Sequence, residues 1–132
     1  MTEDNKTFED LFKEMYNLVK SDQELSEWSQ KCDFKARSKE FFDEVEEIKE
    51  AIEKKDVKNL RDELGDALWD LTYTIFMAEK EGLFEGKDVI QGVINKIKRR
   101  KPWTVEGKKV SREEELKIWN EVKKREKNGE FD

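Results

Sequence analysis

Residues 43–66 read DEVEEIKEAIEKKDVKNLRDELGD and join two helical patterns through one short polar connection. Apolar residues recur at intervals of three and four on both sides of Lys54-Lys55-Asp56, as they do in amphipathic helices. A connection this short makes two successive helices antiparallel neighbours. The stretch therefore predicts a helical hairpin, with Asp56 as the N-cap of its second helix.

Four carboxylates stand in two pairs on this hairpin, Glu44 with Glu47 and Glu63 with Asp66. Residues three apart share one face of a helix, and none of the four has Lys or Arg three or four positions away. In antiparallel packing the two pairs can face one another, where they would repel and raise each other's pKa. Carboxylate oxygens in this number suit Mg²⁺. A solvated acidic face stays open as the alternative, because Asp and Glu make up 33 of 132 residues.

The rest of the chain also predicts helices, at about 6–20, 33–54, 57–80, 87–100 and 112–127. A polar stretch carrying Trp28 follows the first helix, and 102–111 is expected to be a loop that turns near Gly107. The helix over 57–80 has a core stripe of Leu60, Leu64, Leu68, Leu71 and Ile75, with aromatic residues on its other sides. A helix apolar most of the way round should be central, and one chain supplies few helices to wrap it. We therefore expect an all-α helical bundle completed by self-association as a dimer or tetramer.

Composition excludes several classes of function. The net charge of −6 argues against nucleic-acid or anionic-membrane binding, and no apolar run reaches membrane-spanning length. The chain has no histidine, which excludes zinc sites of His and Cys and the Glu-x-x-His pattern of di-iron bundles. Its one cysteine, Cys32, fits a reducing cytoplasm.

The two acidic pairs resemble the mark of the MazG-type all-α nucleoside triphosphate pyrophosphohydrolases, which is E-E-x-x-E followed by E-x-x-D. Here DEVEE at 43–47 is followed by ELGD at 63–66. Further along, KIKRRKP at 96–102 is similar to the family's K-x-x-R-R-H-P, and Trp119 lies in a stretch like its N-W-E-E-I-K. The resemblance covers about residues 28–125. It implies a single MazG-like domain over 1–132, with the final helix at about 112–127 peripheral.

The resemblance implies a set of site residues. The metal ligands would be Glu44, Glu47, Glu63 and Asp66, and one of them, for instance Glu47, could serve as general base. The substrate-binding residues would be Lys96, Arg99 and Arg100 on the phosphates, Trp28 stacked on the base, and Asp70 beside the substrate or behind the metal ligands. The chain departs from the family pattern at four positions, and these departures leave base preference open. Asp43 replaces a glutamate, Phe34 replaces a histidine, and Lys101 and Trp103 replace two histidines.

The expected activity is hydrolysis of a (d)NTP to a (d)NMP and diphosphate in cytoplasmic house-cleaning of nucleotide pools, dependent on Mg²⁺, with Mn²⁺ as the alternative metal. Three alternatives stay open. The first is a narrower dUTPase- or dCTPase-like activity, and the second is phosphoribosyl-ATP pyrophosphohydrolysis. The third is a non-catalytic acidic module that binds a partner through 57–80.

Overall fold

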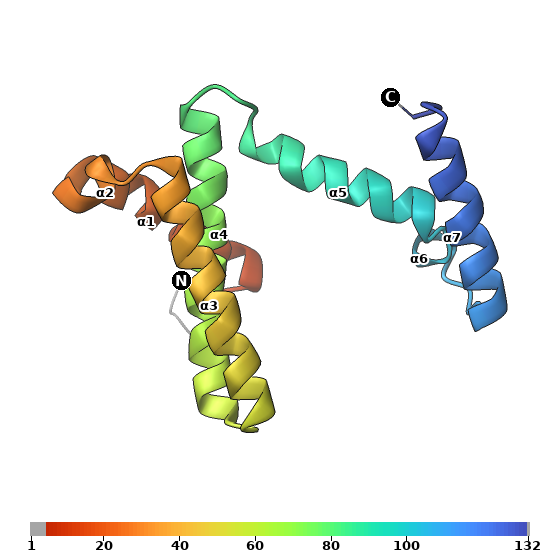
Figure 1. Ribbon diagram of the computed structural model, residues 1–132, viewed down its shortest axis with the longest axis horizontal. Coiled ribbons are helices and arrows are strands. Elements are labelled where there is room, and N and C mark those ends of the chain that lie inside the picture. Colours follow the sequence, from red (N-terminus) through yellow and green to blue (C-terminus); the bar gives the residue numbers. More distant parts are fainter. Residues whose placement is uncertain (1–4, 132) are drawn as a thin grey trace. The chain divides into compact units, whose positions relative to one another are not determined.

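The computed structural model describes residues 5–131, and every regular element within them is an α-helix (Figure 1). The all-α expectation is therefore confirmed. The chain divides into two compact units, residues 1–86 and 87–132. Within 5–131 no helix combines the length and the apolar character needed to cross a membrane.

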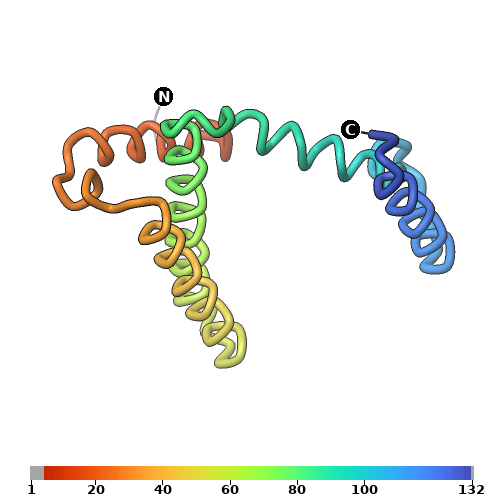
Figure 2. Tube along the Cα trace, turned by 45° about the horizontal axis from the view of Figure 1, so that its top comes forward, coloured from red at the N-terminus to blue at the C-terminus, as the bar shows by residue number. Residues whose placement is uncertain are grey.

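The N-terminal unit is built on a helical hairpin. Helices α3 (Phe34–Glu53) and α4 (Val57–Lys80) run antiparallel and side by side (Figures 1 and 2). Asp56 caps α4, because its side chain accepts a hydrogen bond from the amide of Asn59 at 3.1 Å. The predicted hairpin and its cap are both confirmed.

The turn of the hairpin has a defined geometry. Lys55 adopts a left-handed conformation with φ 56°. Its amide donates to the carbonyl of Ile52 at 3.1 Å, and the amide of Asp56 donates to that of Ala51 at 3.0 Å. This pair of bonds is the Schellman arrangement, which usually has glycine at the left-handed position. Each residue of the connection thus has a defined place in the turn, with Lys54 as the C-cap of α3, Lys55 in the left-handed conformation and Asp56 as the N-cap of α4.

Two further helices complete the unit. Helix α1 (Phe8–Leu25) packs on α4, and α2 (Glu27–Lys31) packs on α1. The prediction that the first helix ends at residue 20 was wrong: the polar run after it continues the helix until Ser26 caps α2. Trp28 accordingly lies on α2 rather than in an irregular stretch.

The core of the N-terminal unit uses an aromatic face of α4. Its buried centre consists of Val19, Tyr73 and Met77, with Phe34, Trp69 and Phe76 packed around it. The predicted core stripe was wrong in part, because Leu64 and Leu71 are 50% and 42% exposed. Periodicity identified α4 as apolar on several sides but did not reveal which side its own chain covers.

The C-terminal unit consists of most of α5 (Gly86–Arg100), together with α6 (Trp103–Glu106) and α7 (Arg112–Lys127). The expected loop at 102–111 contains the short helix α6, so that part of the prediction was wrong. The turn near Gly107 is confirmed, with φ 69° ending α6. The apolar residues of α5 are all at least 37% exposed: Val89, Ile90, Val93, Ile94 and Ile97.

Candidate metal centre and anion-binding groups

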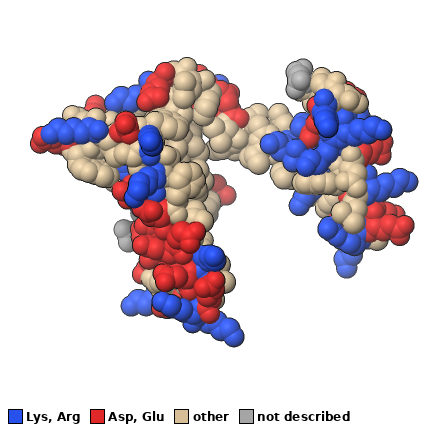
Figure 3. Space-filling model, viewed as in Figure 1, with Lys and Arg blue, Asp and Glu red and all other residues tan. Residues whose placement is uncertain are grey.

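Three of the predicted acidic residues converge on the hairpin. One carboxylate oxygen each from Glu44, Glu63 and Asp66 lies within 4.8 Å of the other two. Helix α3 supplies the first of these residues and α4 the other two. Figure 3 shows acidic side chains gathered over these two helices. The hairpin therefore brings together carboxylates that are about twenty residues apart in the sequence.

No cation of the N-terminal unit neutralises this cluster. Among residues 5–86, none of the ion pairs involves Glu44, Glu47, Glu63 or Asp66. Neighbouring acids on α3 do find partners, since Lys54 lies 3.8 Å from Glu50 and Lys39 lies 3.3 Å from Asp43. The Oε2 atoms of Glu44 and Glu63 are buried, and neither accepts a hydrogen bond. Buried carboxylate oxygens without donors fit a bound divalent cation.

Three carboxyl groups of this acidic region, those of Glu44, Glu47 and Glu63, have pKa values shifted upward. Burial raises the pKa of Glu44, and repulsion from Glu47 and Asp66 adds to the shift. A protonated Glu63 can donate to the neighbouring Glu44 carboxylate, which raises the pKa of Glu63. A protonated Glu47 can likewise donate to Glu63, and repulsion between these two acids also raises the pKa of Glu47. These are the shifts expected of like charges held together, and a divalent cation would reverse them.

Two predicted residues lie at the margin of the cluster. Glu47 is exposed and adjoins Glu63 without joining the three that converge. Asp70 is 7% exposed on α4, and burial raises its pKa to about 6, against the opposing charge of Arg37 and with repulsion from Glu40 and Asp66. Asp70 is therefore a buried acid next to the cluster.

Arg37 is a buried cation that the sequence did not single out. It is 3% exposed, and its guanidinium carbon lies 3.6 Å from the centre of the Tyr73 ring and 5.1 Å from that of Trp28. Its one side-chain hydrogen bond within the described residues is a long one of 3.4 Å to Ser29 Oγ. Trp28 itself is 58% exposed. The indole therefore has Arg37 against it while remaining accessible to solvent.

The predicted phosphate-binding residues lie in the C-terminal unit. Lys96 is exposed, whereas Arg99 and Arg100 both bind Glu126 of α7, with Nη2 atoms 2.7 and 2.8 Å from its carboxylate oxygens. Hydrogen bonds from Arg100 and Arg99 lower the pKa of Glu126 to about 2. Sequence reasoning missed Glu126, because nothing in the pattern of α7 marks a contact made 26 residues away.

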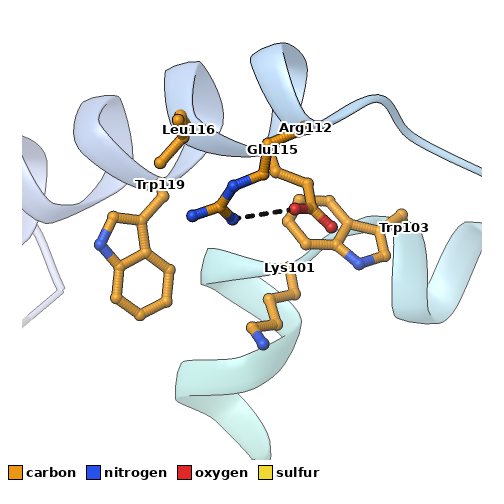
Figure 4. A pocket seen from close by; sticks show the side chains of 6 residues that line it. All are labelled: Lys101, Trp103, Arg112, Glu115, Leu116 and Trp119. Atoms are coloured by element: carbon orange, nitrogen blue, oxygen red, sulfur yellow. Dashed lines mark hydrogen bonds and ion pairs between the residues drawn. The ribbon is translucent and has the colours of Figure 1, made fainter.

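A small pocket lies beside these groups (Figure 4). Its volume is about 260 Å³, and its lining residues are Lys101, Trp103, Arg112, Glu115, Leu116 and Trp119. The two indoles stand on opposite sides of the ion pair between Arg112 and Glu115, whose length is 3.1 Å. The guanidinium of Arg100 lies 5.1 Å from the ring centre of Trp119. Lys101 and Trp103, which depart from the family pattern, therefore line an aromatic pocket next to the paired arginines.

The sequence model of the MazG nucleotide pyrophosphohydrolase domain matches residues 34–105. The chain belongs to the MazG family. The match includes both acidic pairs of the hairpin and the basic end of α5, while Trp28 and Glu126 lie outside it. The resemblance noted in the sequence is thereby confirmed.

Solved and curated MazG relatives agree with this assignment. The crystal structure of a mazG-related protein from Thermotoga maritima superposes with a TM-score of 0.81 at 31% identity, covering 85% of this chain and 98% of that one. The uncharacterized protein YabN of Bacillus subtilis is 34% identical over 76% of this chain and 21% of its own length. The nucleoside triphosphate pyrophosphohydrolase of Escherichia coli K12 is 29% identical over 76% of this chain and 38% of its own length. The part of each of these two curated relatives that matches this chain is less than two-fifths of the relative's own length.

Proposed function

We propose that this MazG domain is a Mg²⁺-dependent nucleoside triphosphate pyrophosphohydrolase, which converts a (d)NTP and water to a (d)NMP and diphosphate. The observation that carries the proposal is the convergence of Glu44, Glu63 and Asp66 within 4.8 Å, with no Lys or Arg of the described N-terminal unit paired to them. The name of the Escherichia coli relative supports the same reaction.

The proposed metal ligands are the three convergent acids, with Glu47 as the fourth. Their donor set is hard oxygen only, which Mg²⁺ prefers and Mn²⁺ accepts. Bound Mg²⁺ would supply charge neutralisation on the phosphate oxygens and increase the acidity of a water molecule. Glu44 and Glu63 are partly buried, whereas Glu47 is exposed and can reach solvent. We therefore assign Glu47 the task of orienting the attacking water as general base.

The remaining proposed residues bind the substrate. Lys96, Arg99 and Arg100 would donate hydrogen bonds to phosphate oxygens, since guanidinium groups match phosphate geometry well. Trp28 would stack on the base, with Arg37 holding the other side of its ring in place. Asp70, buried near the cluster, would contact the substrate or keep the ligands oriented.

One panel of nucleotides tests this function. Diphosphate release is measured with the common NTPs and dNTPs, and with phosphoribosyl-ATP, in the presence of Mg²⁺, of Mn²⁺ and of EDTA. Broad turnover that requires the metal supports nucleotide-pool house-cleaning. Turnover restricted to dUTP, to dCTP or to phosphoribosyl-ATP selects the corresponding narrower activity. If no substrate is hydrolysed in the presence of either metal, the result favours the non-catalytic acidic module instead.

We also propose that the chain works as a homo-oligomer, either a dimer or a tetramer. Leucine and isoleucine side chains on α4 and α5 are exposed to an extent that water disfavours: Leu64 at 50%, Leu71 at 42%, Ile90 at 52% and Ile94 at 40%. Light scattering coupled to size-exclusion chromatography gives the mass, and a monomer would contradict the proposal.

Two further expectations from the sequence stay predictions. The first is that residues 1–132 act together as a single MazG-like domain, with α7 at its periphery. The second is a cytoplasmic location, for which the single free thiol of Cys32 is suited.

A further inference from the structure

Glu126 of α7 receives both guanidinium groups from the basic end of α5. Nε and Nη2 of Arg99 lie 2.8 and 2.7 Å from its Oε2, and Nη2 of Arg100 lies 2.8 Å from its Oε1. The Glu126 side chain is 16% exposed, compared with 47% for Glu130 in its pair with Arg125. One carboxylate therefore binds two cations, and the group of three keeps one net positive charge.

The helix alone does not bring these two arginines together. Consecutive residues of an α-helix are separated by about 100° and do not face one another. Two guanidinium groups at close range also repel. The convergence of Arg99 and Arg100 therefore requires the carboxylate between them. Aromatic rings restrain both groups further, since the guanidinium carbons lie 4.5 Å from the Phe131 ring and 5.1 Å from the Trp119 ring, respectively.

We propose that Glu126 is a positioning residue that assembles Arg99 and Arg100 into one receptor for the phosphate groups of the substrate. This inference rests on the proposed pyrophosphohydrolase function. The contacts with Glu126 use Nε and Nη2 of each arginine. A guanidinium has five N–H donors, so both N–H groups of each Nη1 remain to donate to phosphate oxygens. Lys96, three and four residues earlier on α5, adds a third cation on the same helix face.

Glu126 stays ionised throughout the neutral range, since the two arginines lower its pKa to about 2. The ionic contact with both arginines is therefore kept at neutral pH. A neutral side chain of the same shape would accept hydrogen bonds through one oxygen only and would release one of the two guanidinium groups.

Glu130 offers a matched control in the same unit. It also binds an arginine through a fork, with Nε of Arg125 at 2.8 Å from one oxygen and Nη2 on the other. It holds one cation instead of two, and both partners are 47% exposed. Replacement of Glu130 removes a similar ion pair without separating Arg99 from Arg100.

The experiment compares Glu126→Gln with Glu130→Gln in the full chain. For the best nucleotide of the panel, we expect Glu126→Gln to raise KM about tenfold, which corresponds to about 1.4 kcal/mol, while kcat changes less than about twofold. Glu130→Gln should leave both constants unchanged. Tripolyphosphate binding, measured by calorimetry in EDTA, should weaken about tenfold in Glu126→Gln alone. In an Arg99→Lys/Arg100→Lys background, Glu126→Gln should add no further loss.

Other results overturn the proposal. If Glu126→Gln leaves KM and tripolyphosphate binding unchanged, Glu126 does not assemble the receptor. If KM falls and tripolyphosphate binds more tightly in Glu126→Gln, Glu126 competes with the substrate for the two arginines and does not position them. A loss of kcat or of thermal stability with KM unchanged shows a structural role only. Absence of hydrolysis by the unaltered chain overturns the proposed function, and tripolyphosphate binding still decides the role of Glu126.

Discussion

The two compact units of the chain carry opposite charge and use their ionic groups in different ways. Residues 1–86 contain 24 Asp and Glu against 13 Lys and Arg, whereas residues 87–132 contain 9 against 14. Figure 3 shows acidic side chains over the α3–α4 hairpin and basic ones over the C-terminal unit. The acids of the hairpin cluster remain without a cation, while Arg99 and Arg100 share Glu126. The carboxylates clustered in the acidic unit thus lack a cationic partner within that unit, whereas the two arginines of the basic unit are held in place by a carboxylate of their own unit.

The largest test of this contrast removes one acid of the cluster. We expect Glu63→Gln to reduce Mg²⁺-dependent diphosphate release at least about a thousandfold, or about 4 kcal/mol, because a metal ligand is lost. The variant should stay folded by circular dichroism, since relief of repulsion offsets the lost charge. Mg²⁺ should also raise the melting temperature of the unaltered chain but not of the variant. Glu50→Gln, which breaks a surface pair with Lys54 on the same hairpin, is the control. Equal activity in the two variants would remove the metal site from the hairpin.

The second test uses pH, to which the two units should respond in opposite directions. The pKa of Asp70 is raised from its ordinary 3.8 to about 6, so its contribution to stability is complete below pH 4 and is lost as the pH rises through 6. The pKa of Glu126 is lowered from 4.5 to about 2, so its contribution is complete above pH 4.5 and is lost as the pH falls towards 2. For Asp70 the change amounts to at most about 3 kcal/mol.

Amide hydrogen exchange, corrected for its intrinsic pH dependence, follows each unit separately in EDTA. Protection of α4 should increase from pH 7 to pH 5, and protection of α7 should decrease below pH 4. Asp70→Asn should reduce the first response and Glu126→Gln the second. The raised pKa values of Glu44, Glu47 and Glu63, and the lowered pKa of Glu130, account for the remainder of each response. If both units gained or lost protection together, their ionic groups would not behave as the structure indicates.

A third test concerns the cation that the acidic unit does bury. The guanidinium of Arg37 lies against aromatic rings, whereas those of Arg99 and Arg100 bind a carboxylate. Arg37→Met keeps much of the volume but loses the interaction with the Tyr73 ring, and we expect a loss of about 2 kcal/mol in urea unfolding. Lys35→Met, at an exposed position of α3, should change stability by less than about 0.5 kcal/mol. Equal effects of the two substitutions would show that burial of Arg37 contributes nothing.

The smallest effect is expected at two helical glycines. Gly65 lies in α4 among the acids and Gly92 lies in α5, and a Cβ at either position would meet nothing within 4 Å. Alanine should therefore stabilise each helix by about 1 kcal/mol. Because no contact within the described chain requires either glycine, we expect both substitutions to leave kcat/KM unchanged. A lower kcat/KM in Gly65→Ala alone would contradict this and would show that substrate or a second copy occupies the space beside Gly65.

The hairpin and the convergence of three of its acids could be predicted from the sequence for a local reason. Helix periodicity and a three-residue connection determine which residues of α3 and α4 face each other, and Glu44, Glu63 and Asp66 follow from that geometry. Leu64 and Leu71 were assigned to the core because periodicity reports an apolar face without reporting what covers it.

Glu126 and Arg37 could not be predicted from local pattern. Glu126 meets α5 only because of the way α6 and its following turn return the chain, and its role depends on a contact between distant residues. Arg37 has the sequence context of an ordinary charged residue on an amphipathic helix, and only the structure shows that the rings of Tyr73 and Trp28 lie against it. The environment of both side chains is determined by tertiary contacts, which a local sequence pattern does not show.

The tight turn at Lys55 has a consequence for how this family can vary. Glu44 and Asp66 are each eleven residues from Lys55, and Glu47 and Glu63 are each eight, so the acids are arranged as a palindrome about the turn. If α4 kept its packed face, one residue inserted at its start would move Glu63 and Asp66 by about 1.5 Å along the helix and about 100° around it, away from Glu44 and Glu47. The length of this connection is therefore as much a requirement for the proposed metal site as the carboxylates themselves, although none of its side chains belongs to that site.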